Sequence, residues 1–259
     1  RKQAAAEHEQ QARFATEVSR QGLQTDMASL LGFVGERHIG SPAGVQGLKR
    51  AAAMIEGSLG PGNAGYQVER LRTPETPVGT WPILVVTLRG KDATADPLWV
   101  VAGYDARAGS PGAEANASGV ASVLSAAHSM ANDAPRRAVI FAFLPHVYDE
   151  ESPLMETFEV LKKRINVSSE VLVVESTGSA DALMVSTRDA GNRALQKIEG
   201  LGEVVGAESI CLEDDFDLSS VLFEMGLPAV RVSTRPVVKI DEEDSSAPDP
   251  GKHAAATGT

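Results

Sequence analysis

The stretch WVVAGYDARAGSPGAEANASGVASVLSAAHSM, Trp99–Met130, decides the predicted fold of this chain. It begins with a short apolar run that is typical of a strand buried on both faces. A loop rich in glycine and proline follows and carries Asp105 and Glu114. Apolar residues then recur at helical spacing and predict a helix, which Asn116 or Ser118 can cap. Because open α/β sheets bind ligands in the loops that leave the carboxyl ends of their strands, this loop is the first candidate for a site.

The rest of the chain alternates between predicted strands and helices. Apolar runs bounded by turn residues predict strands at residues 66–71, 83–88, 99–102, 137–143, 171–174, 182–186 and 228–232, and either a strand or a loop at residues 209–212. Helical spacing predicts helices at residues 4–34, 43–59, 118–130, 149–164 and 191–199, and within 213–226. A strand pair that leads into a buried strand, followed by strand and helix alternation, favours an α/β protein whose mixed sheet has an antiparallel edge.

Length and composition favour a single domain. The chain has 259 residues, 42% of them hydrophobic, which is enough to bury one substantial core. We expect this domain to span residues 1–240 and to begin with a helical segment at residues 1–35. Residues 241–259 are acidic and then rich in alanine and glycine, and they predict a flexible tail.

Charge and cysteine content exclude several classes of function. A net charge of −11 and a pI near 5.0 argue against binding to nucleic acid or to an anionic membrane, because both require a basic face. The single cysteine, Cys211, excludes an internal disulfide and a multi-cysteine zinc site. No apolar run is long enough for a transmembrane helix. Since the chain begins at Arg1 rather than Met, we expect that an upstream signal or anchor was removed.

The central loop keeps a recognisable frame, with Pro-Gly at 111–112 and Ala-Ser-Gly at 117–119. An Arg-x-x-Gly-Ser turn at 37–41 precedes it, and a Gly-Leu-Pro sequence at 226–228 closes the series. In this order and spacing the segments resemble the zinc-dependent aminopeptidase family, which includes di-zinc aminopeptidases, glutamate carboxypeptidases and glutaminyl cyclases. The resemblance covers Asp26–Val232. It implies a three-layer α/β/α fold with a mixed, mostly parallel, doubly wound sheet, and an exported or membrane-anchored location.

The resemblance also implies five zinc-ligand positions, and three of them lack a ligand here. The family's His-x-Asp triplet is Gly103-Tyr104-Asp105 in this chain, so glycine replaces the first histidine, while Asp105 keeps the place of the orienting aspartate. Ala115 stands where the bridging aspartate is expected, and Ser219 stands where the last histidine is expected. Glu175, after the predicted strand at 171–174, matches a further carboxylate ligand.

The fifth position depends on the length of the loop after the predicted strand at 137–143. The family has a Glu-Glu pair there, a general base followed by a zinc ligand. Without a gap these positions are His146 and Val147. If the loop is about four residues longer, they are Glu150, as the general base, and Glu151, as the ligand. Both alignments remain open on the sequence.

The predicted function is therefore a binding or scaffold protein with a degenerate site. Loss of three ligands should abolish a zinc pair, since loss of even one supporting residue weakens such sites by roughly 10- to 100-fold. We expect no cofactor and an unidentified protein or peptide partner. The candidate pocket residues are Asp105, His146, Glu150, Glu151 and Glu175. The family's transferrin receptor and nicastrin ectodomains are non-catalytic precedents.

The alternative is an active metal-dependent hydrolase. Its site would hold zinc or another divalent metal, for example a single ion bound by carboxylates and His146. A serine hydrolase is disfavoured because no Gly-x-Ser-x-Gly sequence surrounds Ser110, Ser118 or Ser219.

Overall fold

The computed structural model describes residues 19–178, 183–188, 192, 208–211, 218–227 and 229–235. Within these residues, one eight-stranded sheet has the order β1-β2-β4-β3-β5-β8-β6-β7. Strands β4, β3, β5 and β8 pair in parallel, as do β6 and β7. Antiparallel pairing joins β1 to β2, β2 to β4 and β6 to β8. The predicted α/β class and the mixed, mostly parallel sheet with an antiparallel edge are confirmed.

The strands are short, as expected for a sheet of this kind. They are β1 (Glu69–Leu71), β2 (Ile83–Leu88), β3 (Leu98–Gly103), β4 (Val139–Leu144), β5 (Glu170–Val174), β6 (Met184–Thr187), β7 (Glu208–Cys211) and β8 (Ala229–Ser233). The α-helices are α2 (Arg20–Ala28), α3 (Pro42–Leu59), α4 (Gly119–Met130), α5 (Leu154–Lys162) and α8 (Leu218–Glu224). Two π-helical segments are η1 (Ser29–Val34) and η2 (Ala113–Ser118).

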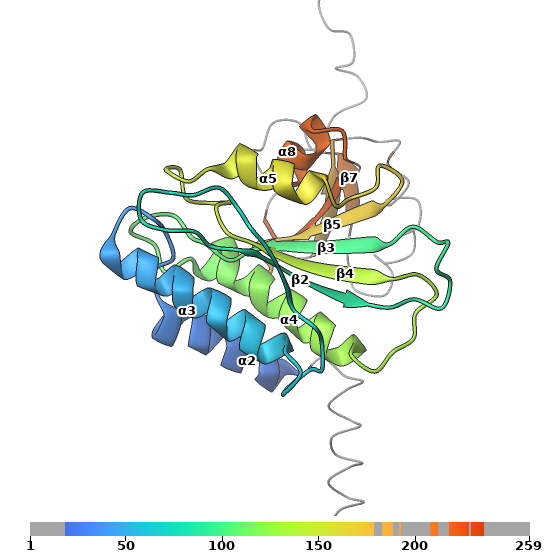
Figure 1. Ribbon diagram of the computed structural model, residues 1–259, viewed down its shortest axis with the longest axis horizontal. Coiled ribbons are helices and arrows are strands. Elements are labelled where there is room, and N and C mark those ends of the chain that lie inside the picture. The colour runs from blue at the N-terminus through green and yellow to red at the C-terminus, as the bar shows by residue number, and fades with distance from the viewer. Residues whose placement is uncertain are drawn as a thin grey trace, which may run out of the picture.

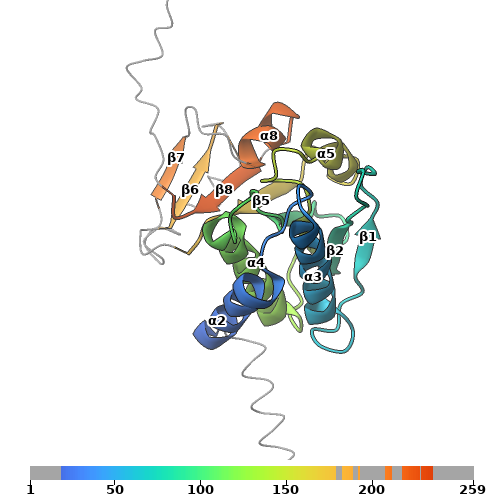
Figure 2. The same ribbon diagram turned by 90° about the vertical axis from the view of Figure 1, so that its left-hand side faces the viewer.

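Helices cover both faces of the sheet, which gives the expected three layers. Helices α2, α3 and α4 lie on one face, and α5 and α8 lie on the other (Figures 1 and 2). Each face has its own apolar core. Phe141 and Phe143 of β4 belong to the α3/α4 side, and Trp99 and Val101 of β3 belong to the α5/α8 side. None of the helices in the described part of the chain has the length and apolarity that a membrane span requires.

The turn before α3 caps this helix and also positions the loop between β3 and η2. The Ser41 side chain accepts a hydrogen bond from the backbone N–H of Gly44 and caps α3. Just before this cap, the guanidinium of Arg37 is buried and donates to the carbonyl oxygens of Tyr104, Pro111 and Gly112. Arg37, in the turn before α3, thus fixes both ends of the loop between β3 and η2.

Several predicted boundaries differ from the structure. The strand predicted at 66–71 shortens to β1, and the helix predicted from 149 begins only at Leu154, because residues 149–152 form a turn before Pro153. The predicted N-terminal helix is described only from Arg20. The helix predicted at 191–199 and the tail at 241–259 lie outside the described residues, apart from Asn192.

Candidate functional site

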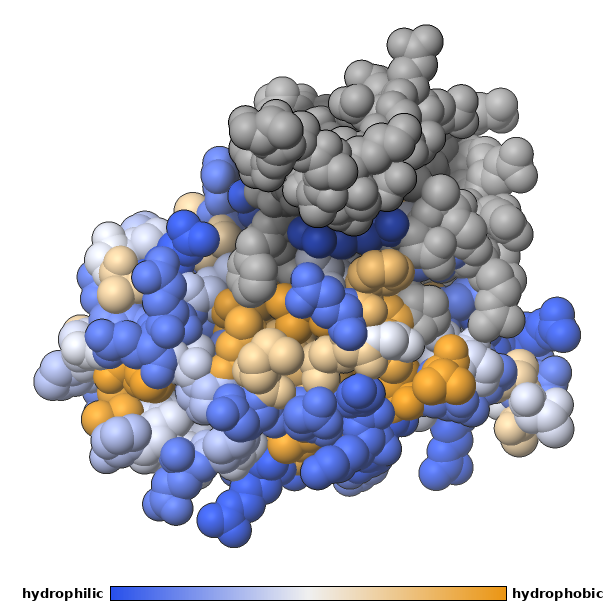
Figure 3. Space-filling model, turned by 90° about the horizontal axis from the view of Figure 1, so that it is seen from above, coloured by the Kyte–Doolittle hydropathy of each residue, from blue (hydrophilic) through white to orange (hydrophobic). Residues whose placement is uncertain are grey.

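A cavity of about 770 Å³ lies where the loops after β3, β4 and β5 meet α5 and α8. This volume is in the range of small-molecule and peptide pockets. Figure 3 views the molecule from the side on which α5 and α8 lie and shows an apolar area near the centre of this face, beside hydrophilic residues. The cavity is lined by Arg107, Ser110, Pro111, Gly112, Ala113, Glu114, Ala115, Val147, Tyr148, Asp149, Glu150, Ser152, Leu154, Phe158, Glu175, Ser176, Leu218, Val221 and Arg235.

Gly103, at the end of β3, is the residue that the resemblance aligns with the first zinc-binding histidine, and the structure leaves no room for a side chain there. A Cβ on Gly103 would lie 2.7 Å from Cε2 of Tyr148 and 2.9 Å from Cβ of Val147. The β4–α5 loop therefore occupies the space that a ligand at residue 103 needs.

Ala115 lines the cavity wall but brings no donor atom. It is joined to Asn116 by a cis peptide bond. The buried Asn116 amide oxygen accepts hydrogen bonds from the backbone N–H groups of Gly119 and Ser176, and its nitrogen donates to the carbonyl of Val174. Of the two predicted caps of α4, Asn116 makes the bond, and it also ties α4 to the end of β5.

Asp105 is fully buried and accepts hydrogen bonds from the backbone of the β4–α5 loop. One carboxylate oxygen accepts three hydrogen bonds, from the N–H groups of Val147, Tyr148 and Asp149, at 2.7, 2.8 and 3.0 Å. Burial raises the pKa of Asp105 to about 6, although these N–H donors oppose the shift. Asp105 therefore shapes the β4–α5 loop, and it is not among the residues that line the cavity.

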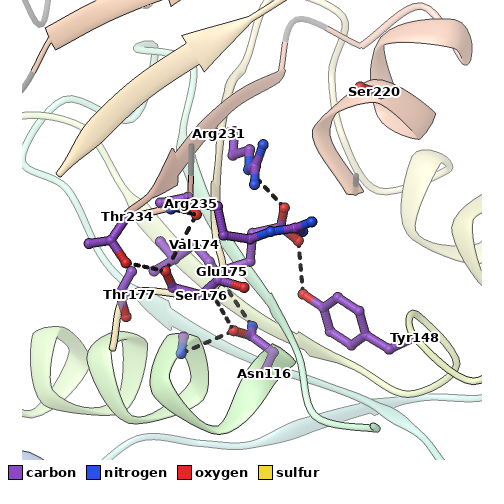
Figure 4. A network of polar contacts seen from close by, with 12 residues as sticks. Asn116, Tyr148, Val174, Glu175, Ser176, Thr177, Ser220, Arg231, Thr234 and Arg235 are labelled. Atoms are coloured by element: carbon purple, nitrogen blue, oxygen red, sulfur yellow. Dashed lines mark hydrogen bonds and ion pairs between the residues drawn. The ribbon is translucent and has the colours of Figure 1, made fainter. Parts of the chain in front are cut away.

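Glu175, just after β5, is the strongest ligand candidate from the sequence, and it lines the cavity. Both of its oxygens are engaged (Figure 4). One lies 2.9 Å from Nε of Arg231, and the other accepts a hydrogen bond of 2.9 Å from the Tyr148 hydroxyl. Burial, followed by the adjacent Glu175 carboxylate, raises the pKa of Tyr148, which keeps the hydroxyl protonated as a donor.

The structure separates the three remaining pocket candidates. Glu150 is exposed and lines the cavity, whereas Glu151 lies outside the lining, with its carboxylate beside Gly40. His146 is buried with a φ of 63°, and its ring meets the Trp81 ring edge-on at 5.8 Å between centroids. Neither His146 nitrogen has a hydrogen-bond partner among the described residues, and burial lowers the pKa of His146 to about 4.

These residues do not fit a pair of zinc ions. Two-metal sites need imidazole and carboxylate donors converging on ions roughly 3.5–4 Å apart. Position 103 is closed, Ala115 has no donor, and Ser219 is a buried residue of α8. Across the described part of the chain, no three His, Cys, Asp or Glu side chains gather in a way that would hold a metal ion.

Sequence reasoning missed three residues that organise the site: Arg37, Tyr148 and Arg231. A signal existed for Arg231, because it is a charged residue inside an apolar strand, AVRVS, where a buried cation requires an anionic partner. Arg37 and Tyr148 carried no such signal, since they lie in turns where arginine and tyrosine are ordinarily exposed.

Known proteins share this fold. Residues 84–198 match the profile of Peptidase family M28, while no curated protein sequence matches the chain. The LapA aminopeptidase of Legionella pneumophila superposes with a TM-score of 0.64 at 17% identity, over 88% of this chain and 63% of LapA. A Fimbriiglobus ruber glutaminyl cyclase gives 0.61 at 16%, over 85% of each chain. BSAP, a zinc aminopeptidase from Bacillus subtilis, gives 0.50 at 19%, over 61% of this chain and 40% of BSAP.

The class that the fold defines is an α/β protein built like these aminopeptidases and glutaminyl cyclases. The match to Peptidase family M28 covers residues 84–198, which is less than half of the chain, so it is a similarity of that segment. The chain spans less than two thirds of LapA, and identities this low speak for the fold alone.

Proposed function

We propose that this chain is a non-catalytic member of the M28 fold group, in which the cavity is a binding site for a protein or peptide partner and holds no metal cofactor. The observation that carries the proposal is the closure of position 103 by Val147 and Tyr148. Metal-dependent hydrolysis requires a cation beside the substrate carbonyl, and among the residues that the structure describes no three His, Cys, Asp or Glu side chains converge to hold one.

The first experiment tests for a metal and for turnover together. Protein purified without chelator or metal-affinity resin is dialysed against micromolar zinc, and its metal content is measured by plasma mass spectrometry. Aminoacyl anilides and a peptide with N-terminal glutamine are then offered as substrates. We expect less than about a tenth of an equivalent of metal, as for a site without its ligands, and no turnover. One or two equivalents of metal, with turnover that a chelator abolishes and added zinc restores, would establish the metallo-hydrolase alternative.

The second experiment tests the binding role. Peptides selected from a displayed library against the wild-type chain are measured against Ala113→Trp, which fills the cavity wall. The matched control is Ala53→Trp, at an exposed position of α3 on the opposite layer. We expect binding to be lost in Ala113→Trp and kept in the control. Equal binding to both variants would exclude the cavity as the binding site.

A further inference from the structure

Arg231 is a cation inside an apolar layer. Its position in β8 is paired with Val173 of β5, so the Arg231 side chain lies on the same face of the sheet as that of Val173. Val173 belongs to the core beneath α5 and α8, together with Phe158 and Leu222. The Arg231 side chain is 0% exposed. Such a charge is tolerated only when an opposite charge and well-placed hydrogen bonds offset its loss of water.

Glu175 provides that opposite charge. Glu175 follows Val173 by two residues, so its side chain lies on the same face of the sheet as that of Arg231. The two side chains are diagonal neighbours on adjacent strands. The Glu175 side chain is 1% exposed, and its two oxygens divide between Arg231 and Tyr148. Figure 4 shows the three side chains converging from β8, from the end of β5 and from the β4–α5 loop.

We propose that the Arg231 guanidinium is a built-in counter-ion that takes the place of a metal cation beside Glu175. It neutralises the carboxylate that the family resemblance assigns to zinc, and it leaves Tyr148 positioned over Gly103. The proposal goes beyond the proposed function, because it states what stabilises the site without metal. It has two consequences: a chelator should not change the stability of the fold, and the Glu175 carboxylate should not bind an amine of a ligand.

The direct test is chemical rescue of a variant that lacks the cation. Arg231→Ala removes the guanidinium and leaves space, and ethylguanidinium is the probe added to fill it. The readout is the midpoint of urea unfolding. We expect ethylguanidinium to raise the midpoint of Arg231→Ala and to leave the wild type unchanged.

Two control variants separate charge replacement from cavity filling. Leu222→Ala removes an apolar side chain from the same layer and leaves the Glu175–Arg231 pair in place. Glu175→Gln combined with Arg231→Ala removes the anion that the probe should meet. Neither should respond to ethylguanidinium. An equal rise in either control would overturn the proposal, as would the absence of any rise in Arg231→Ala.

A second measurement covers the case in which Arg231→Ala does not fold. Glu175→Gln and Arg231→Met should each raise the unfolded-to-folded ratio by on the order of 10²- to 10³-fold, and Glu175→Leu with Arg231→Met should recover most of that loss. If the stability losses of the two single variants simply add in the double variant, and a chelator has no effect on the wild type, the counter-ion proposal is refuted and the proposed function is not. A chelator that lowers the wild-type midpoint, with zinc restoring it, would refute both the counter-ion and the proposed function.

Discussion

Replacing Gly103 with alanine tests how tightly Val147 and Tyr148 pack against residue 103. The added Cβ would lie 2.7 Å from Cε2 of Tyr148 and 2.9 Å from Cβ of Val147. Neither neighbour yields easily. The Tyr148 hydroxyl is bonded to Glu175, and the Val147 N–H is bonded to Asp105. The new methyl group therefore strains a loop that is fixed at both residues.

The magnitude follows from two opposing effects. Overpacking a well-packed core costs about 1–3 kcal/mol. The lower entropy of the unfolded alanine chain returns about 0.4–1 kcal/mol. Gly103→Ala should therefore lower the free energy of unfolding by about 1–2 kcal/mol, which for a chain of this size lowers Tm by about 2–4 °C.

Urea unfolding with a matched glycine variant measures the effect. Gly57 is exposed in α3, and no atom lies within 4 Å of where its Cβ would be. Gly57→Ala should stabilise the helix by about 0.5–1 kcal/mol, so the same chemical change has opposite signs at the two positions. In a Tyr148→Ala background the cost of Gly103→Ala should shrink, because the nearest atom is gone. If Gly103→Ala is as stable as the wild type, a side chain fits at residue 103 and the argument from closure fails.

Three further predictions concern buried polar residues. Burial lowers the pKa of His146 from 6.5 to about 4, so the folded state binds fewer protons than the unfolded state between these pH values, and the free energy of unfolding falls as pH drops through them. The loss is about 3 kcal/mol between pH 7 and pH 4. His146→Asn, in which asparagine tolerates the positive φ, should remove this loss in urea unfolding measured across that range. Burial raises the pKa of Asp105 from 3.8 to about 6, so the folded state binds more protons and stability falls as pH rises through that window. Asp105→Asn, whose amide oxygen still accepts the N–H bonds, should abolish that fall, and an unchanged pH profile would contradict the burial of the charge. Asn116→Ala leaves the N–H groups of Gly119 and Ser176 without their acceptor and should cost about 2–4 kcal/mol by thermal unfolding, whereas Asn63→Ala, at an exposed turn, should cost less than about 1 kcal/mol.

The fold was predictable because its signals are local. The apolar run at 83–88 and the helix at 43–59 each lie within a few residues of the elements β2 and α3. These signals depend on periodicity within a short window, and the sheet follows from their alternation. Boundaries failed where a turn competed with a helix, as at residues 149–152.

The contacts that define the site were not predictable, because each joins residues far apart in sequence. Tyr148 meets Glu175 across 27 residues, and Arg37 meets Gly112 across 75. Position 103 illustrates the difficulty: the resemblance aligns Gly103 with a zinc-binding histidine, but only the path of the β4–α5 loop shows that Val147 and Tyr148 fill the space beside it. The assignments of Asp105, Glu150 and Glu175 to a ligand pocket stay predictions.

Two of the acidic residues that the resemblance assigns to a zinc site, Asp105 and Glu175, have structural partners that make no use of a metal. Asp105 accepts three backbone N–H groups of one loop, and Glu175 neutralises a buried arginine. Since each carboxylate is required by its immediate neighbours, its presence in the sequence is no argument for a metal centre. The exposed Glu150 has no such partner among the described residues that line the cavity, and it faces the cavity from the β4–α5 loop. A substitution there should change what the cavity binds without changing the stability of the fold, which is the separation between function and folding that Asp105 and Glu175 do not allow.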